Sequence, residues 1–217
     1  MTTIGILGTG RMGTRLATLF ADVGHQVVLG SREFARAQRT AAALQRQNIR
    51  PADYAQAAQA PVVVPAMFLR DGLLATLEPL RAHLHGKVWI DITNPFNDTY
   101  TDFILPWHTS SAETIQQHFP TARLVGAFKN VWWEVFDAPQ FEGRVSDVFV
   151  VGDDAEAKQL FYTLVHGTPF RYLDAGRLAN ARTVERMTLL SGELGQRYGY
   201  FPRMNYTLLG EKRPAAA

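Results

Sequence analysis

The chain has 217 residues, of which 47% are hydrophobic, so it can bury a core and is too apolar to be disordered. Its formal net charge of +2, without a basic block, gives no indication of a nucleic-acid partner. The absence of cysteine excludes disulfides, thiolate metal sites and thiol catalysis, and the six histidines are too scattered to predict a metal site.

The first predicted element is an apolar strand from Ile4 to Leu7, which leads into the pattern G-x-G-x-x-G and then into a helical pattern. In such a turn the glycines allow a tight bend, a close approach of backbone to pyrophosphate, and close packing of helix on strand. The helix N-terminus adds N–H donors and a partial positive charge. We therefore expect a dinucleotide to bind at the residues of this turn, namely Gly8, Thr9, Gly10, Arg11, Met12 and Gly13.

The end of the second apolar strand, at Val27–Leu29, indicates which dinucleotide is preferred. An NAD site usually has Asp or Glu there to bind the ribose hydroxyls, whereas this chain has Ser31 and Arg32, with Arg36 one helical turn later. Hydroxyl and guanidinium groups suit a 2′-phosphate. We therefore predict a preference for NADP(H).

The remaining chain alternates helical and strand patterns. Helices are expected over 34–47, 52–58, 71–84, 110–118, 154–165 and 178–198, and strands over 61–64, 88–92, 124–128, 145–151 and 170–173, with a long loop at 96–109. This alternation predicts a doubly wound α/β fold with a mostly parallel sheet. Because ligands bind at the carboxyl ends of such strands, we expect a site built from 8–13, 65–68, 93–95 and 127–130.

The chain resembles the family of NADPH:coenzyme F420 oxidoreductases and their reductase relatives. The resemblance rests on the glycine turn, on Gly30-Ser31-Arg32, on D-I-T-N-P at 91–95, and on L-D-A-G at 173–176, and spans nearly the whole sequence. It implies one NADP-binding Rossmann domain over 1–217, with a small C-terminal strand–helix extension at about 145–210. It also implies a homodimer that forms through the C-terminal helix.

The resemblance further implies how NADP(H) is held and what accepts the hydride. Thr9 to Met12 would hold the pyrophosphate, and Ser31, Arg32 and Arg36 the 2′-phosphate. The nicotinamide end would lie among residues at the strand ends, namely Val64, Pro65, Phe68, Asn94, Pro95 and Ala127. Coenzyme F420, a deazaflavin, is the expected co-substrate. Its acidic tail would need cations, which Arg144, Arg171, Arg177 or Arg182 could supply.

Lys129 departs from the family's pattern and leaves two interpretations open. A lysine at the end of a central strand could donate a proton to a ketone or imine, which would make the protein a diverged NADPH-dependent reductase. Alternatively, Lys129 pairs with Glu134 or a cofactor phosphate, or reaches solvent. Trp132 and Trp133 also have two interpretations: they could form a platform for a flat acceptor, or they could serve ordinary packing.

A different class of function, a non-catalytic NADP(H) sensor, would keep the nucleotide site and use the tryptophan-rich segment as a partner surface. The sequence shows no signal peptide and no apolar stretch long enough to cross a bilayer, so we expect a soluble cytoplasmic protein without a membrane partner. The Pro214–Ala217 ending is expected to be a frayed tail.

Overall fold

The computed structural model describes residues 1–210, so the Pro214–Ala217 ending lies outside it. The main sheet consists of β1 (Thr3–Leu7), β2 (Gln26–Ser31), β3 (Ile49–Asp53), β4 (Val62–Pro65), β5 (Val88–Asp91) and β6 (Arg123–Gly126). All six strands are parallel, in the order β3-β2-β1-β4-β5-β6. The chain crosses to the other half of the sheet between β3 and β4, and the switch point between β1 and β4 is where such folds bind ligands.

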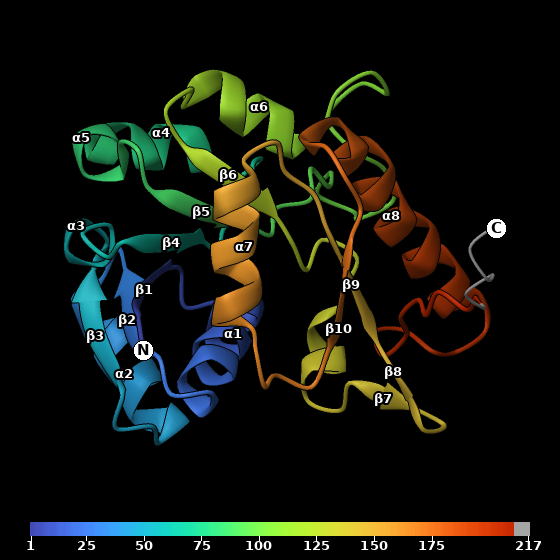
Figure 1. Ribbon diagram of the computed structural model, residues 1–217, viewed down its shortest axis with the longest axis horizontal. Coiled ribbons are helices and arrows are strands. Elements are labelled where there is room, and N and C mark those ends of the chain that lie inside the picture. Colours follow the sequence, from blue (N-terminus) through green and yellow to red (C-terminus); the bar gives the residue numbers. More distant parts are fainter. Residues whose placement is uncertain (211–217) are drawn as a thin grey trace, which may run out of the picture.

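Helices cover both faces of this sheet (Figure 1). One face carries α1 (Arg11–Asp22), α2 (Phe34–Leu44) and α7 (Ala155–Leu164), and the other carries α3 (Tyr54–Ala57), α4 (Leu73–Leu77), α5 (Arg81–Leu84) and α6 (Ser111–His118). The strands supply apolar side chains to both layers in alternation: in β5, Val88 and Ile90 join the first core and Trp89 the second. The doubly wound α/β fold is confirmed.

The C-terminal third adds a smaller layer beside β6. It contains η2 (Trp133–Phe136), the hairpin β7 (Gln140–Phe141) and β8 (Arg144–Val145), the parallel pair β9 (Asp147–Val150) and β10 (Arg171–Asp174), and η3 (Leu178–Asn180), which leads into α8 (Ala181–Arg197). Val151, directly after β9, forms an antiparallel bridge with Gly126 of β6. In Figure 1, α8 lies at the opposite end of the molecule from β3.

Several elements differ from the sequence-based expectation: η2 and β7 were not predicted, and the strand expected over 145–151 is divided between β8 and β9. β3 was not predicted, because Arg50 and Pro51 interrupt its apolar pattern; proline is tolerated there since β3 is an edge strand. The helix expected over 71–84 is divided into α4, η1 (Glu78–Leu80) and α5, because Pro79 cannot donate a helical hydrogen bond.

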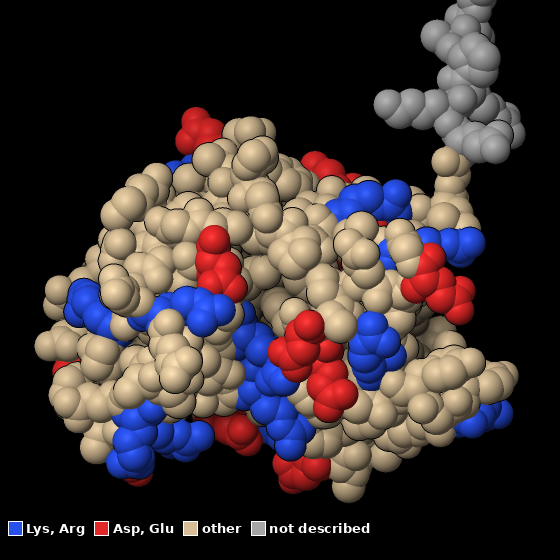
Figure 2. All heavy atoms as spheres, turned by 90° about the horizontal axis from the view of Figure 1, so that it is seen from below, with Lys and Arg blue, Asp and Glu red and all other residues tan. Residues whose placement is uncertain are grey.

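The surface carries charges of both signs. On the face shown in Figure 2, Lys and Arg side chains alternate with Asp and Glu side chains and with uncharged residues, and neither sign covers the face. No helix within residues 1–210 combines the length and the apolar character that a membrane crossing requires.

Candidate functional site

The glycine turn between β1 and α1 has the geometry that a bound phosphate requires. Gly8 adopts a φ of 137°, which side chains with a Cβ rarely allow, and a Cβ at Gly13 would lie 2.1 Å from the carbonyl oxygen of Gly8. A Cβ at Gly10, in contrast, would meet nothing within 4 Å. Gly10 is the N-cap of α1 and no side chain of the described residues caps the helix, so its first N–H groups can bind a phosphate.

The residues expected to bind a 2′-phosphate lie together after β2. Ser31 is buried and its Oγ accepts a hydrogen bond of 3.3 Å from the N–H of Glu33, while Arg32 and Arg36 are exposed. Tyr54, which sequence reasoning missed, is half-buried near these arginines: burial raises the pKa of its phenol and the two positive charges partly oppose the rise. Two guanidinium groups and a phenol ring suit the phosphorylated adenosine end of NADP(H).

A pocket of about 350 Å³ lies at the carboxyl edge of the sheet, next to the glycine turn. Each of the four segments expected at this edge contributes lining residues, and the loop after β5 and helix α8 add others. The lining consists of Gly10, Arg11, Met12, Ala66, Met67, Phe68, Ile92, Thr93, Asn94, Phe96, Tyr100, Phe128, Val131, Trp132, Trp133 and Thr188. Its place at the β1–β4 switch point and its size suit the nicotinamide half of the cofactor together with a second ring.

Aromatic rings form a continuous wall of this pocket. The ring of Phe96 lies 5.4 Å from that of Tyr100 and 5.7 Å from that of Trp132, and Trp132 lies 5.8 Å from Trp133. The Arg11 guanidinium stacks over Trp133 at 4.6 Å from the ring centroid. Trp132 is also a packing residue, since it is 6% exposed and its indole N–H donates to Ser191 Oγ at 3.0 Å. Both interpretations of the tryptophan pair therefore have structural support.

Two polar atoms in the pocket lining have no partner within the described residues. Thr93 Oγ1 and Asn94 Oδ1 are buried and make no hydrogen bond. The amide nitrogen of Asn94 is already committed, because it donates to the carbonyl of Lys129 at 2.7 Å. Buried acceptors are rarely left unsatisfied, so these atoms fit a ligand that carries its own hydrogen-bond donors, as the nicotinamide carboxamide does.

Lys129 does not line the pocket. Its side chain is fully buried, and its ammonium lies 2.6 Å from Asp91 Oδ2 and 2.9 Å from Glu185 Oε1 and donates to the carbonyl of Thr93 at 2.5 Å. Burial lowers the pKa of this ammonium, but the two carboxylates outweigh burial and raise it overall. The ammonium donates its protons to three acceptors, the Thr93 carbonyl, Glu185 Oε1 and, at 3.3 Å, the Ser111 hydroxyl, so the geometry does not support proton donation to a substrate. Its partners are not Glu134 or solvent.

Four residues expected at the nicotinamide end lie behind the pocket wall. Val64, Pro65, Pro95 and Ala127 are buried and do not line the pocket. Val64 and Ala127 point into the core layer under α1 and α7. Their neighbours Ala66, Thr93 and Phe128 reach the pocket instead.

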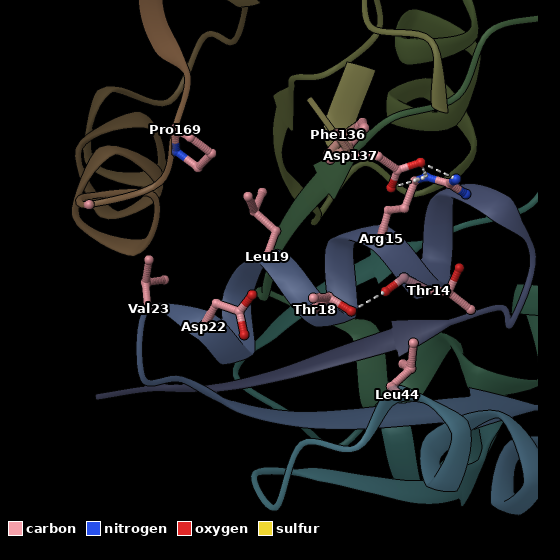
Figure 3. A pocket seen from close by; sticks show the side chains of 11 residues that line it. Thr14, Arg15, Thr18, Leu19, Asp22, Val23, Leu44, Phe136, Asp137 and Pro169 are labelled. Carbon is pink, nitrogen blue, oxygen red and sulfur yellow. Dashed lines mark hydrogen bonds and ion pairs between the residues drawn. The ribbon is translucent and has the colours of Figure 1, made fainter. Parts of the chain in front are cut away.

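A second hollow, of about 410 Å³, lies on the outer side of α1 (Figure 3). Arg15 and Asp137 form an ion pair at one end of it, and Pro169 lies across from Leu19 and Val23. It shares no lining residue with the pocket at the carboxyl edge. Within residues 1–210, its lining includes neither the glycine turn nor a buried polar side-chain atom without a partner, so we assign the cofactor to the smaller pocket.

Similarity to known proteins shows the family of this chain. The family described as NADP oxidoreductase, coenzyme F420-dependent, matches residues 3–95. The F420-dependent NADP reductase of Methanocaldococcus jannaschii is 30% identical over 210 residues, which cover 90% of this chain and 93% of that protein. The chain belongs to this family. As a member of the coenzyme F420-dependent NADP oxidoreductases it is an NADP-dependent oxidoreductase, which favours an enzyme over a non-catalytic NADP(H) sensor.

Other relatives extend the comparison. The metalloreductase STEAP3 of Rattus norvegicus is 30% identical over 187 residues, but the chain spans only 36% of that protein's length. A solved structure from Arthrobacter sp. FB24, assigned as an F420-dependent NADP reductase, superimposes with a TM-score of 0.86 at 25% identity. That match covers 97% of this chain and 100% of the other, so the family resemblance holds over the C-terminal layer as well as the sheet.

Proposed function

We propose that this oxidoreductase passes a hydride between NADP(H) and a planar heterocycle of the deazaflavin or flavin class, with coenzyme F420 as the first candidate. The observation that carries the proposal is the pocket in which the phosphate-binding turn faces a wall of aromatic rings. Aromatic side chains favour stacked or edge-on contact with a flat ring. The name of the Methanocaldococcus jannaschii relative supports the same acceptor.

The side chains of this protein bind and orient the two partners. NADPH, when bound, supplies a hydride from its nicotinamide ring. The glycine turn would hold its pyrophosphate, Arg32 and Arg36 its 2′-phosphate, and Asn94 Oδ1 would accept from its carboxamide. Phe96, Trp132 and the other rings of the wall would exclude water and hold the acceptor ring in contact distance.

Two of the arginines that the sequence suggested as partners for the acidic tail of coenzyme F420 are already ion-paired within the protein. Arg171 is ion-paired with Asp147 at 2.6 Å, and Arg182 is ion-paired with Glu113. Arg11, in contrast, lines the pocket and is exposed, so it is a cation at the mouth of the site itself. We therefore propose Arg11 as a contact for an anionic group of the acceptor or of the cofactor.

The alternative acceptor, a small ketone or imine, depended on Lys129 as proton donor. Because that ammonium is fully buried and holds three acceptors, the feature that favoured the alternative is absent from the pocket. Hydride exchange between two ring systems needs no such lysine, which agrees with the first proposal.

We also propose that the protein is a homodimer that associates through α8. This helix buries small and polar residues against the rest of the chain and leaves Leu190 and Leu194 at 52% and 39% exposure. Tyr198 and Tyr200, directly after α8, are 63% and 62% exposed, and their rings stack on each other. Such a surface suits an interface between two copies. The cytoplasmic location expected from the sequence stays a prediction.

The proposed function is tested by NADPH oxidation with purified oxidised coenzyme F420, with FMN, FAD, ketones and cyclic imines assayed in parallel. We expect bleaching of the deazaflavin or flavin absorbance that matches the loss of NADPH one to one. Turnover with a ketone or imine alone would contradict the proposal and would require a proton donor other than Lys129.

A further inference from the structure

A buried charged cluster lies directly behind the pocket wall, at the junction of β5, β6, α6 and α8. Lys129 and Glu185 have no exposed surface and Asp91 is 2% exposed. A buried ion pair contributes little net stability compared with apolar residues of the same volume. The cluster therefore calls for a role other than stability, and its hydrogen bonds show which atoms it fixes.

Lys129 holds the pocket residues Thr93 and Asn94 from behind. Its ammonium binds the carbonyl of Thr93 at 2.5 Å, and its own carbonyl accepts from the Asn94 amide at 2.7 Å and from the Thr188 hydroxyl. Asp91 adds a third contact, because its Oδ1 accepts from the Thr93 N–H at 2.9 Å. With these groups fixed, the only polar side-chain atoms of the Thr93–Asn94 segment without a partner are Thr93 Oγ1 and Asn94 Oδ1.

Glu185 links this arrangement to the two helices that pack behind it. Its carboxylate, on α8, accepts from Lys129 at 2.9 Å, from the Ser111 hydroxyl at 2.7 Å, and from the N–H groups of Ser111 and Ala112 at 3.0 and 3.3 Å. The same Ser111 hydroxyl also lies 2.6 Å from the carbonyl of Thr93. One carboxylate thus connects α8, the start of α6, and the ammonium that holds Thr93.

We propose that Glu185 is a positioning residue for the nicotinamide end of the site: it holds Lys129, and Lys129 holds Thr93 and Asn94 so that their unsatisfied oxygens face the cofactor's carboxamide. The inference rests on the assignment of the pocket to NADP(H). Glu185 is fully buried and does not line the pocket, so it acts through Lys129 and Ser111.

The experiment compares the dissociation constants of two ligands for Glu185→Gln, one with and one without a nicotinamide. NADP⁺ spans the whole site, whereas adenosine 2′,5′-bisphosphate reaches only the end near Arg32 and Arg36. In the wild-type protein the Glu185 carboxylate accepts hydrogen bonds from four donors. In the variant one carboxylate oxygen becomes an amide N–H₂, which cannot accept, so the cluster must rearrange. We expect NADP⁺ binding, measured calorimetrically, to weaken on the order of tenfold, as for one lost hydrogen bond. Binding of adenosine 2′,5′-bisphosphate should be unchanged.

A matched control is Arg182→Met. It removes the ion pair between Arg182 and Glu113, which joins the same two helices but lies away from the pocket, so both ligands should bind as to the parent protein. If Glu185→Gln does not fold, Thr188→Val removes a single hydroxyl that binds the Lys129 carbonyl and should give the same pattern more weakly.

Three results would overturn the inference. The first is unchanged NADP⁺ affinity in a folded Glu185→Gln protein, and the second is equal weakening of both ligands, which would indicate general loss of structure. The third, a parent protein that binds neither ligand, would contradict the cofactor assignment itself and is separable from the other two because it needs no variant.

Discussion

The carbonyl oxygen of Gly8 lies 2.1 Å from the position that a Cβ of residue 13 would take, so the two glycines are in direct backbone contact. Real Cβ atoms do not approach an oxygen so closely, so Gly13 cannot be replaced without moving α1, and a Cβ at Gly8 would lie 2.4 Å from the carbonyl oxygen of Ala66. Gly10, within the same motif, faces open space. Gly8 and Gly13 therefore close the turn, and Gly10 keeps room for a ligand.

This difference predicts opposite behaviour of two substitutions. Gly10→Val should fold with only a slightly lower Tm, since valine is a poor N-cap, but its side chain fills the space of the phosphates. We expect NADPH affinity, measured by quenching of tryptophan fluorescence, to fall at least about tenfold. Gly13→Ala should instead lower stability by about 1–3 kcal/mol through overpacking. Normal NADPH binding by Gly10→Val would contradict the assignment of the turn.

The arginines after β2 are predicted to set the preference for NADPH over NADH. Replacing both Arg32 and Arg36 by Ala removes charge-assisted hydrogen bonds, each of about 1.5–3 kcal/mol, to a group that NADH lacks. Because two such groups are lost, we expect the ratio of kcat/KM for the two coenzymes to fall by at least about 100-fold. Arg39→Ala, one turn further along α2, is the control and should leave the ratio unchanged. Equal loss with both coenzymes would argue against a 2′-phosphate contact.

The sequence predicted the β1–α1–β2 unit well because each part has a local signal: an apolar strand, a glycine turn, and a helical period. It could not predict the role of Lys129, because its partners Asp91 and Glu185 are distant in sequence and meet only in the folded protein. All four strand ends line the pocket, but Ala66 lines it and Val64 does not, because Val64 is inside β4 and Ala66 follows the last residue of that strand.

The buried face of helix α8 could not be predicted from its sequence pattern either. Its apolar stripe of Val184, Met187, Leu190 and Leu194 suggests the buried face, yet only Val184 of the four is buried. The face that packs inward carries Glu185, Thr188, Ser191 and glycines because it meets the Lys129 cluster and Trp132. The helical spacing of apolar residues in a sequence identifies an apolar face. It does not indicate whether that face packs within the chain or against another copy.

The exposed stripe leads to a prediction about the oligomer. Leu190→Lys combined with Leu194→Lys should convert a dimer into a monomer, because burying two ammonium groups in an apolar interface is unfavourable. The measurement is mass by size-exclusion chromatography with light scattering. Phe34→Lys, an exposed apolar residue at the start of α2, is the control. A parent protein that is already monomeric at micromolar concentration would contradict the proposed interface.

Asp154 should stabilise the folded protein at neutral pH but not at strongly acidic pH. The Arg123 guanidinium, together with the Ala157 N–H that Asp154 caps, lowers the pKa of this carboxyl to about 2. Its contribution is therefore fully present above the unfolded pKa near 4 and is lost as the pH falls toward 2. Asp154→Asn should lower the free energy of unfolding at pH 7, and the difference from the parent should shrink below about pH 4. Glu156→Gln, which removes a highly exposed partner of Arg123, should have little effect.

Substitution of Trp133 tests whether the aromatic wall of the pocket binds the acceptor. Trp133 lines the pocket beneath Arg11, whereas Trp107 is 80% exposed and does not line the pocket. An aromatic contact contributes about 0.5–1.5 kcal/mol, so Trp133→Leu should raise the KM for the acceptor by roughly 2- to 10-fold. NADPH affinity, measured calorimetrically, should change less.

Trp107→Leu provides the matched control, because it removes the same kind of side chain from outside the pocket, where it stacks on Arg186. Its steady-state constants should equal those of the parent protein. If the two variants behave alike, the acceptor does not lie against Trp133. If Trp133→Leu instead weakens NADPH binding and leaves the acceptor KM unchanged, the wall holds the nicotinamide ring, and the acceptor must approach from the side of Phe68 and Tyr100.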